Sequence, residues 1–262
     1  MCLIIPGRNL FNLISCNDII INRKNPPVFV TAFEEAYLTI RKLENRIYSD
    51  EQVVQLPVIE RTHVHFKEWK IRKRSANRLL SYLKKKNKPL VILEVGCGNG
   101  WLSGMMSSLN NSRVIGADLN KIELQQAKRV FDNRANLSFE TGGLGNIDPD
   151  KKFDVIVFAA SIQYFSSFDE TIRSAFSHLN PHGEIHIIDS HFYQPKDLEK
   201  ARQRSYAYFA SMGNLAMNDF YFHHTMDSLN VFQYKILFNP SSVRNRITFT
   251  NDPFPWICIT SR

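Results

Sequence analysis

The stretch Leu90–Ser103 constrains the fold of this chain more than any other segment. Four apolar residues lead into Glu94, and glycines follow at positions 96, 98 and 100. An apolar run of this length predicts a buried parallel strand, and residues 101–103 can begin a helix. Glycines at such a junction let the backbone turn sharply and approach a ligand, which open α/β sheets bind beyond the carboxyl ends of their strands.

The spacing of these glycines excludes two other nucleotide-binding motifs. A dinucleotide fingerprint reads G-x-G-x-x-G, whereas here the third glycine comes one residue early, at Gly100. The lysine of a phosphate-binding P-loop is also missing. The run E-x-G-x-G-x-G from Glu94 to Gly100 resembles the first motif of class I, Rossmann-like S-adenosylmethionine-dependent methyltransferases.

A second predicted strand ends in a carboxylate that can bind a nucleotide together with the glycine turn. Arg113–Asp118 reads as an apolar strand that ends in a carboxylate, 18 residues after Gly100. A carboxylate at this strand end accepts ribose hydroxyls in nucleotide-binding βαβ units. The alternative is that Asp118 only caps the helix that follows.

Strand and helix patterns alternate through the rest of the chain. The patterns predict strands at 90–95, 113–118, 136–140, 153–159 and 183–189, and helices at 102–110, 121–132, 168–179 and 195–212. Val231–Phe238 and Trp256–Thr260 read as two further strands. We therefore expect an α/β fold with a doubly wound, mainly parallel seven-stranded sheet and helices on both faces. The resemblance implies that the last strand is antiparallel.

Two segments add to this core. Residues 1–28 show no clear pattern, and helical spacing begins at about residue 29. We expect residues 1–88 to form a helical N-terminal extension that caps the active site, and residues 89–262 to form the core. Residues 195–230, between the fifth and sixth strands, lie where the resembled enzymes carry a substrate lid. Their aromatic and methionine side chains suit an apolar or aromatic substrate, or simply the interior of the lid.

Composition and charge limit the classes of partner. Of 262 residues, 44% are hydrophobic, and no apolar run approaches the ~20 residues of a membrane span. The four cysteines, at positions 2, 16, 97 and 258, have neither metal-ligand nor disulfide spacing, so we expect a reducing cytoplasm and no metal. Arg61–Lys88 carries eleven basic residues against one acid, Glu68. This segment either binds nucleic acid or is a solvated helix face.

Later motifs favour a small methyl acceptor. Phe153–Phe165 resembles the fourth motif of small-molecule methyltransferases, and Leu179–Gly183 resembles the turn into their fifth strand. The Asn/Asp-Pro-Pro-aromatic tetrad of enzymes that methylate base amino groups is missing after the fourth strand. The best overall likeness is to the group that includes quinone-biosynthesis methyltransferases. An RNA or ribosomal-protein substrate, recognised through Arg61–Lys88, is the alternative, and a non-catalytic cofactor-binding protein is a third hypothesis.

The resemblance implies a set of cofactor-binding residues. The glycine turn would hold the methionyl part of S-adenosylmethionine, Asp118 would hold the ribose, and Trp69 and Arg72 would cover the cofactor from a preceding helix. The related group has Gly-Asp after its third strand, whereas this chain has Gly142-Gly143, so backbone groups and Leu144 would have to hold the adenine. The expected cofactor-binding residues are Glu94, Gly96, Cys97, Gly98, Gly100, Asp118, Leu119, Gly142, Leu144, Ala160, Trp69 and Arg72.

An acceptor that carries a proton needs a base, and histidine titrates near neutral pH. His191, just after the fifth strand, is the preferred catalytic candidate, and His223 in the lid segment is the second. Each can instead be a hydrogen-bonded histidine of a loop or of the lid interior. Strand alternation predicts that His186 and Asp189 lie on opposite faces of the sheet.

Overall fold

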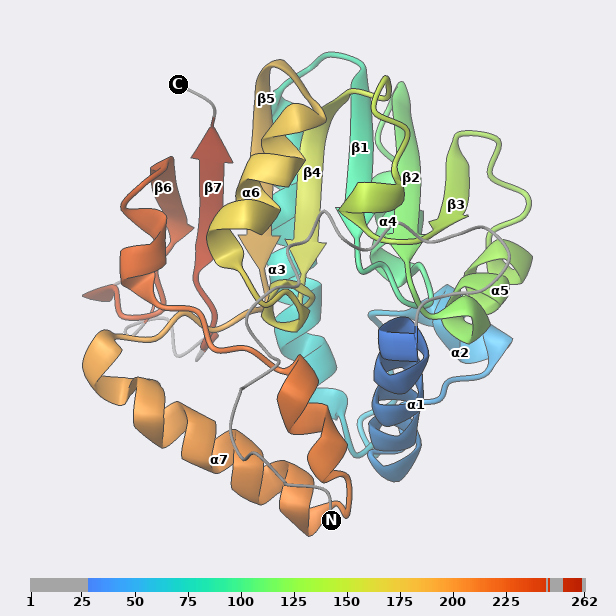
Figure 1. Ribbon diagram of the computed structural model, residues 1–262. Helices are drawn as coiled ribbons and strands as arrows, with labels where there is room; N and C mark the ends of the chain where they lie inside the picture. The colour runs from blue at the N-terminus through green and yellow to red at the C-terminus, as the bar shows by residue number, and fades with distance from the viewer. Residues whose placement is uncertain (1–27, 244, 246–251, 261–262) are drawn as a thin grey trace, which may run out of the picture.

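The computed structural model describes residues 28–243, 245 and 252–260 of the chain, and its seven strands form one sheet (Figure 1). The strand order is β3-β2-β1-β4-β5-β7-β6. The first five strands pair in parallel, and β7 is antiparallel to both of its neighbours, which confirms the expected α/β architecture. The strands are β1 (Leu90–Val95), β2 (Ser112–Asp118), β3 (Leu137–Thr141), β4 (Phe153–Ala159), β5 (Leu179–Ile188), β6 (Gln233–Phe238) and β7 (Trp256–Thr260).

Helices cover both faces of the sheet. The helices are α1 (Val28–Leu43), α2 (Asp50–Gln55), α3 (Phe66–Lys85), α4 (Trp101–Met106), α5 (Lys121–Val130), α6 (Phe168–Ser177) and α7 (Leu198–Ser211). One face packs against α3, α4 and α5 through a buried cluster that includes Leu79 and Leu102. The other face packs against α6, where Phe168 and Ile172 are buried. Because β1, β2 and β4 are covered on both sides, the apolar runs that predicted these strands are explained, whereas β3 and β6 at the two edges of the sheet are more exposed.

A third apolar cluster lies beyond the carboxyl ends of the parallel strands. Ala36 and Ile40 of α1 pack there against Phe209 of α7 and against Met217 of η4 (Leu215–Phe220), a short 3₁₀ segment. In Figure 1, α1 and α7 both lie below the arrowheads of β1, β4 and β5. The segment between β5 and β6 and the N-terminal helix therefore meet over the edge of the sheet where α/β proteins bind ligands.

Several element boundaries differ from the sequence-based expectations. The fifth strand begins at Leu179 because Leu179 pairs with Phe153 before a register shift. Helical spacing of apolar residues extends from Val30 to Tyr48 in the sequence, but the first helix ends at Leu43, and a separate short helix, α2, follows it. Ser49 and Gln52 form a capping box at the start of α2, a signal that the sequence contained. Residues 1–27 lie outside the described part of the chain.

The basic segment Arg61–Lys88 is partly neutralised by the fold. Arg74 and Arg78 of α3 both pair with Asp252, which is 1% exposed at its side chain. Arg72, Lys86 and Lys88 also pair with carboxylates, so five of the eleven basic side chains lie in ion pairs. Within the described ranges, no helix combines the length and the apolar character needed to cross a membrane.

Candidate active site

The glycine turn after β1 adopts a backbone conformation that other residues rarely reach. Gly96, Gly98 and Gly100 have φ angles of 74°, 54° and 76°, all in the left-handed region. The amide of Gly96 donates to the carbonyl of Ala117 at 2.8 Å, which fixes the turn against the end of β2. A Cβ atom on Gly96 would lie 2.5 Å from the Cβ of Ser161, so glycine is required there.

Asp118 at the end of β2 is tied to the same turn. Its Oδ2 accepts a hydrogen bond from the amide of Gly98 at 2.7 Å, and its Oδ1 accepts one from the amide of Asn120 at 2.7 Å. Helix α5 is capped by the side chain of Asn120, so the alternative role of Asp118 as the helix cap is wrong. Burial, followed by the negative charge of Glu123, raises the pKa of Asp118 to about 6.

Glu94 on β1 is a second buried carboxyl beside the turn. It is 2% exposed, and the hydroxyl of Ser103 donates a hydrogen bond to its Oε2. Burial raises the pKa of Glu94 to about 8, so this carboxyl is largely protonated at neutral pH. A nearby positive charge would favour the ionised form of both Glu94 and Asp118.

Two adjoining cavities lie at this edge of the sheet. The larger has a volume of about 490 Å³ and the smaller about 190 Å³. They have four lining residues in common: Tyr37, Gly96, Ala160 and Tyr164. An elongated ligand that crosses these four residues would contact the glycine turn on one side and the end of β2 on the other.

Most of the expected cofactor-binding residues line these cavities. The larger one is lined by Glu94, Gly96, Cys97, Gly98, Ala160, Trp69 and Arg72. The smaller one is lined by Asp118, Leu119 and Gly142, together with Gly96 and Ala160. The sequence therefore identified residues on both sides of the junction, although they come from α3 and from the ends of four different strands.

Two of the expected residues, Gly100 and Leu144, line neither cavity. Leu144 is 5% exposed and packs in the core on the α6 side of the sheet, because it begins a 3₁₀ turn (η1, Leu144–Asn146) that directs it inward. Leu144 therefore does not lie at the wall of either cavity, where an adenine contact would need it. A Cβ on Gly100 would lie 2.7 Å from Phe139, so this glycine allows close packing. The thiol of Cys97 is also buried in the core, near Gly116.

The smaller cavity is lined by aromatic residues that were not assigned to the cofactor site from the sequence. Phe33 and Tyr37 come from α1, Tyr164 and Phe165 follow β4, and Phe220 and Phe222 come from the segment after α7 that was expected to form a substrate lid. The rings of Tyr37 and Tyr164 meet edge to face, with centroids 5.7 Å apart. The spacing of Phe33 and Tyr37 by one helical turn was the available signal, but it did not indicate what the helix covers.

Trp69 and Arg72 lie one turn apart on α3, as expected. The indole of Trp69 donates to the hydroxyl of Tyr48 at 2.8 Å, and its ring meets Trp101 edge to face at 5.2 Å. The guanidinium of Arg72 lies 5.6 Å from the Trp69 ring and donates to Glu68 at 2.9 Å. These contacts hold both side chains at the wall of the larger cavity.

The two histidines proposed for catalysis occupy different positions. His191 lines the larger cavity, and its ring lies 4.6 Å from that of Phe254. His223 lines neither cavity; its Nε2 forms a 2.8 Å hydrogen bond with the hydroxyl of Ser205. Burial lowers the pKa of both histidines. The positive charge of Arg204 adds to the shift at His191, and the charges of Arg202 and Arg204 add to it at His223.

His186 and Asp189 lie on the same face of the sheet, which corrects the expectation from strand alternation. The ring of His186 meets that of Tyr82 on α3, and the hydroxyl of Ser75 on α3 donates to Oδ1 of Asp189 at 2.6 Å. The strand ends at Ile188, and Asp189 has a φ of 55°, so the alternation does not continue through it.

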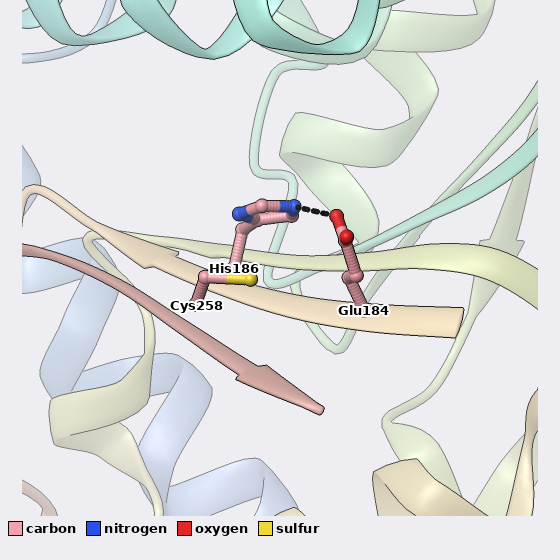
Figure 2. A group of neighbouring side chains, drawn as sticks. All are labelled: Glu184, His186 and Cys258. Atoms are coloured by element: carbon pink, nitrogen blue, oxygen red, sulfur yellow. Dashed lines mark hydrogen bonds and ion pairs between the residues drawn. The ribbon is translucent and has the colours of Figure 1, made fainter. Parts of the chain in front are cut away.

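His186 also belongs to a compact group with Glu184 of β5 and Cys258 of β7 (Figure 2). Nε2 of His186 lies 3.1 Å from Glu184, and its Nδ1 accepts from the indole of Trp256 at 3.1 Å. Lys86 also donates to Glu184, at 2.7 Å. Burial raises the pKa of Cys258 to about 12. These groups therefore form a hydrogen-bonded network between α3, β5 and β7.

Comparison with known sequences identifies the central part of the chain. Residues 92–183 match the family described as "Methyltransferase domain". A malonyl-[acyl-carrier protein] O-methyltransferase of Halalkalibacterium halodurans is 27% identical over 52% of this chain and 54% of its own length. A ribosomal protein L11 methyltransferase of Lactobacillus johnsonii is 30% identical over 45% of this chain and 37% of its own length. The chain thus spans about half the length, or less, of the curated relatives it matches.

Comparison with solved structures supports the fold. The YcgJ protein of Bacillus subtilis superimposes with a TM-score of 0.55 at 15% identity, over 71% of this chain and 99% of that chain. Magnesium protoporphyrin IX methyltransferase from Synechocystis, solved with bound S-adenosylhomocysteine, gives a TM-score of 0.54 at 13% identity, over 84% and 94% of the two chains. Residues 92–183 thus match a methyltransferase domain, and the seven-stranded sheet with an antiparallel β7 is the one that the resemblance to class I S-adenosylmethionine-dependent methyltransferases implied.

Proposed function

We propose that this protein transfers a methyl group from S-adenosylmethionine to a small acceptor bound in the larger cavity. The observation that carries the proposal is the junction of the two cavities at Gly96 and Ala160, with Asp118 in the smaller and Glu94 in the larger. The adenosine part fits the smaller cavity, where Asp118 would hold the ribose. The amino-acid part fits the larger cavity, beside the glycine turn and Arg72.

The cofactor, when bound, supplies a methyl group on a sulfonium, and transfer is an in-line displacement by the acceptor atom. The protein's task is to align the acceptor and to exclude water. The third apolar cluster, between α1, α7 and η4, supports this role because it covers the edge of the sheet where the two cavities lie. An acceptor that must lose a proton would have His191 beside it, and His223 would act only through Ser205.

Side chains of α7 and η4 support a small acceptor with an apolar or aromatic part. Phe209, Met217 and Tyr221 line the larger cavity. Arg204 of α7 lies exposed at the same cavity. The other three arginines that line it pair with glutamates, whereas Arg204 has no carboxylate at ion-pair distance within the described residues. An acidic acceptor, as the name of the malonyl-carrier relative suggests, is therefore our more specific proposal, in preference to a quinone precursor.

The alternative substrate, RNA or a ribosomal protein, is favoured by the Lactobacillus johnsonii relative and by the basic segment. Five of the eleven basic side chains of Arg61–Lys88 are already engaged in ion pairs, which weakens the electrostatic support for nucleic-acid binding. We therefore propose the small-molecule acceptor as the primary function.

The function is tested by incubating the protein with methyl-labelled S-adenosylmethionine and an extract of the source organism. Small molecules, RNA and protein are then separated, and the labelled fraction is treated with mild alkali. Label in the small-molecule fraction supports the proposal, and its release as methanol identifies a methyl ester of an acid. Label in RNA, or label in protein that mild alkali does not release as methanol, contradicts the proposed acidic acceptor. Binding of the cofactor without any labelled product supports the non-catalytic hypothesis instead.

We expect the affinity for S-adenosylmethionine to rise as the pH increases from about 6 to about 8. In the free protein Asp118 and Glu94 ionise only as the pH passes about 6 and about 8, and the cationic cofactor favours the ionised forms. Calorimetric titrations in buffers of different ionisation enthalpy should show proton release on binding at pH 7. Glu94→Gln should remove the upper part of this pH dependence. An affinity that is flat across the range would contradict the assignment.

We also expect Gly143→Asp to tighten the binding of S-adenosylhomocysteine about fivefold. In the resembled group an aspartate at this place accepts the adenine amino group, and one charge-assisted hydrogen bond contributes roughly 1.5–3 kcal/mol before the cost of ordering the side chain. Gly143 has a φ of −101°, lines the smaller cavity and has open space at its Cβ position, so a side chain fits. Gly143→Ala is the control and should leave the affinity unchanged. Weaker binding by the aspartate variant alone would contradict the placement of adenine.

A further inference from the structure

Asp189 is the one strongly buried aspartate in the larger cavity that the proposed function does not use. It is 5% exposed, and it follows directly after β5 with a φ of 55°. Such a conformation is uncommon for residues other than glycine, although aspartate and asparagine tolerate it better than most. Here it directs a carboxylate from the end of the strand toward α3, where Ser75 donates to Oδ1.

The second carboxylate oxygen of Asp189 has no hydrogen-bond partner in the described part of the chain. Oδ2 is buried and unpaired, although Oδ1 is held at 2.6 Å by Ser75. A buried acceptor without a donor is destabilising, so native proteins rarely keep one without a function. Burial raises the pKa of Asp189, and the positive charge of Arg72 opposes this shift. The site is therefore suited to a ligand that supplies a cationic donor.

A series of contacts along α3 links Asp189 to the helix that follows the glycine turn. The hydroxyl of Ser75, besides binding Asp189, lies 3.1 Å from the carbonyl of Arg72, one turn earlier on α3. Arg72 lies against Trp69, and Trp69 meets Trp101, the first residue of the helix that follows the turn. Asp189 and Arg72 thus bring opposite charges to the wall of the cavity that faces the proposed amino-acid end of the cofactor.

We propose that Asp189 binds the ammonium group of this amino-acid end, while Arg72 attracts its carboxylate. The inference rests on the proposed function, since it needs the cofactor to occupy both cavities. A zwitterionic α-amino acid presents a cation and an anion next to each other, and the Asp189–Arg72 pair is complementary to it. Ionised carboxylates make shorter and stronger hydrogen bonds to ammonium donors than neutral groups do. Asp189 is thus a binding residue for the cofactor.

The inference is tested with two ligands that differ only at the end in question. S-adenosylhomocysteine carries the amino-acid end, whereas 5′-methylthioadenosine keeps the adenosine and the sulfur but lacks that end. We expect Asp189→Asn to weaken the binding of S-adenosylhomocysteine at least about tenfold and that of 5′-methylthioadenosine less than about twofold, because a charged hydrogen bond is worth roughly 1.5–3 kcal/mol. Asparagine also tolerates the left-handed backbone, so the fold should be kept.

Asp154→Asn is the matched control. Asp154 is also a carboxylate that accepts a hydrogen bond, from the amide of Val91 at 2.8 Å, but it lies at the opposite end of the sheet and lines neither cavity. It should change neither affinity. The inference is overturned if Asp189→Asn weakens the binding of both ligands equally, or if it weakens the binding of neither. The inference is also overturned if the wild-type protein binds both ligands with equal affinity, and this measurement needs no variant. If the wild type binds neither ligand, the proposed function itself fails.

Discussion

Replacing Gly96 with alanine is expected to abolish measurable binding of S-adenosylhomocysteine while the sheet stays folded. Gly96 has a φ of 74°, where an L-residue pays roughly 1–2 kcal/mol. The added Cβ would also lie 2.5 Å from the Cβ of Ser161, whose hydroxyl is held by the carbonyl of Val95 at 2.6 Å. The turn must therefore shift at the place where the two cavities meet. We expect binding at least about 100-fold weaker, equivalent to roughly 2.7 kcal/mol.

Gly213→Ala separates backbone strain from this clash. Gly213 has a φ of 68°, close to that of Gly96, but no other atom lies within 4 Å of its Cβ position. It follows α7 and lines neither cavity. This variant should lose stability in a thermal melt by about 1 kcal/mol while its affinity for S-adenosylhomocysteine stays that of the wild type. If both variants lost affinity equally, the clash at Gly96 would not be the cause.

Asp118→Asn is expected to weaken the binding of every adenosine-containing ligand by about 100-fold. The carboxylate accepts from the amides of Gly98 and Asn120, each at 2.7 Å, and its remaining lone pairs are available to ribose hydroxyls. An amide has one oxygen and an NH₂ group that must then face a backbone donor. Hydrogen bonds to charged groups contribute roughly 1.5–3 kcal/mol each. The loss of one ribose contact, together with the displacement of the glycine turn, therefore accounts for the expected decrease in affinity.

Asp148→Asn is the matched control for this substitution. Asp148 also accepts from the amide two residues later, that of Asp150 at 3.0 Å, but it lies in an exposed turn. It should leave the calorimetric affinity for S-adenosylhomocysteine and for 5′-methylthioadenosine unchanged. Wild-type affinity in Asp118→Asn would remove the proposed ribose contact, even if other residues still held the cofactor.

The sheet and the glycine turn could be predicted because their signals are local. Apolar runs such as Leu90–Leu93 indicate strands that are covered on both faces, and the spacing from Gly96 to Gly100 selects one type of turn. Asp118 was found because a strand must end where its apolar run ends. In each case, neighbouring residues contain the information, and the structure places Gly96 and Asp118 at the same edge of the sheet.

The other contributions to the site depend on contacts between distant segments. Tyr37 and Phe220 meet over the edge of the sheet only because α1 packs against the segment after α7. Leu144 was expected at the adenine, but the 3₁₀ turn after β3 directs it into the core. The position of Asp189 was mispredicted because strand periodicity does not reveal where a strand ends with a left-handed residue. Such features follow from tertiary packing, which sequence spacing does not encode.

The two cavities together are proposed to hold one S-adenosylmethionine across Gly96. A calorimetric titration of the purified, folded wild-type chain with S-adenosylhomocysteine, with NADH titrated in parallel, tests this. We expect one binding site per chain for S-adenosylhomocysteine, competed by S-adenosylmethionine, and no binding of NADH, because the glycine spacing is not that of a dinucleotide turn. Folded protein that takes up NADH, or that gives no heat with S-adenosylhomocysteine, would contradict this proposal.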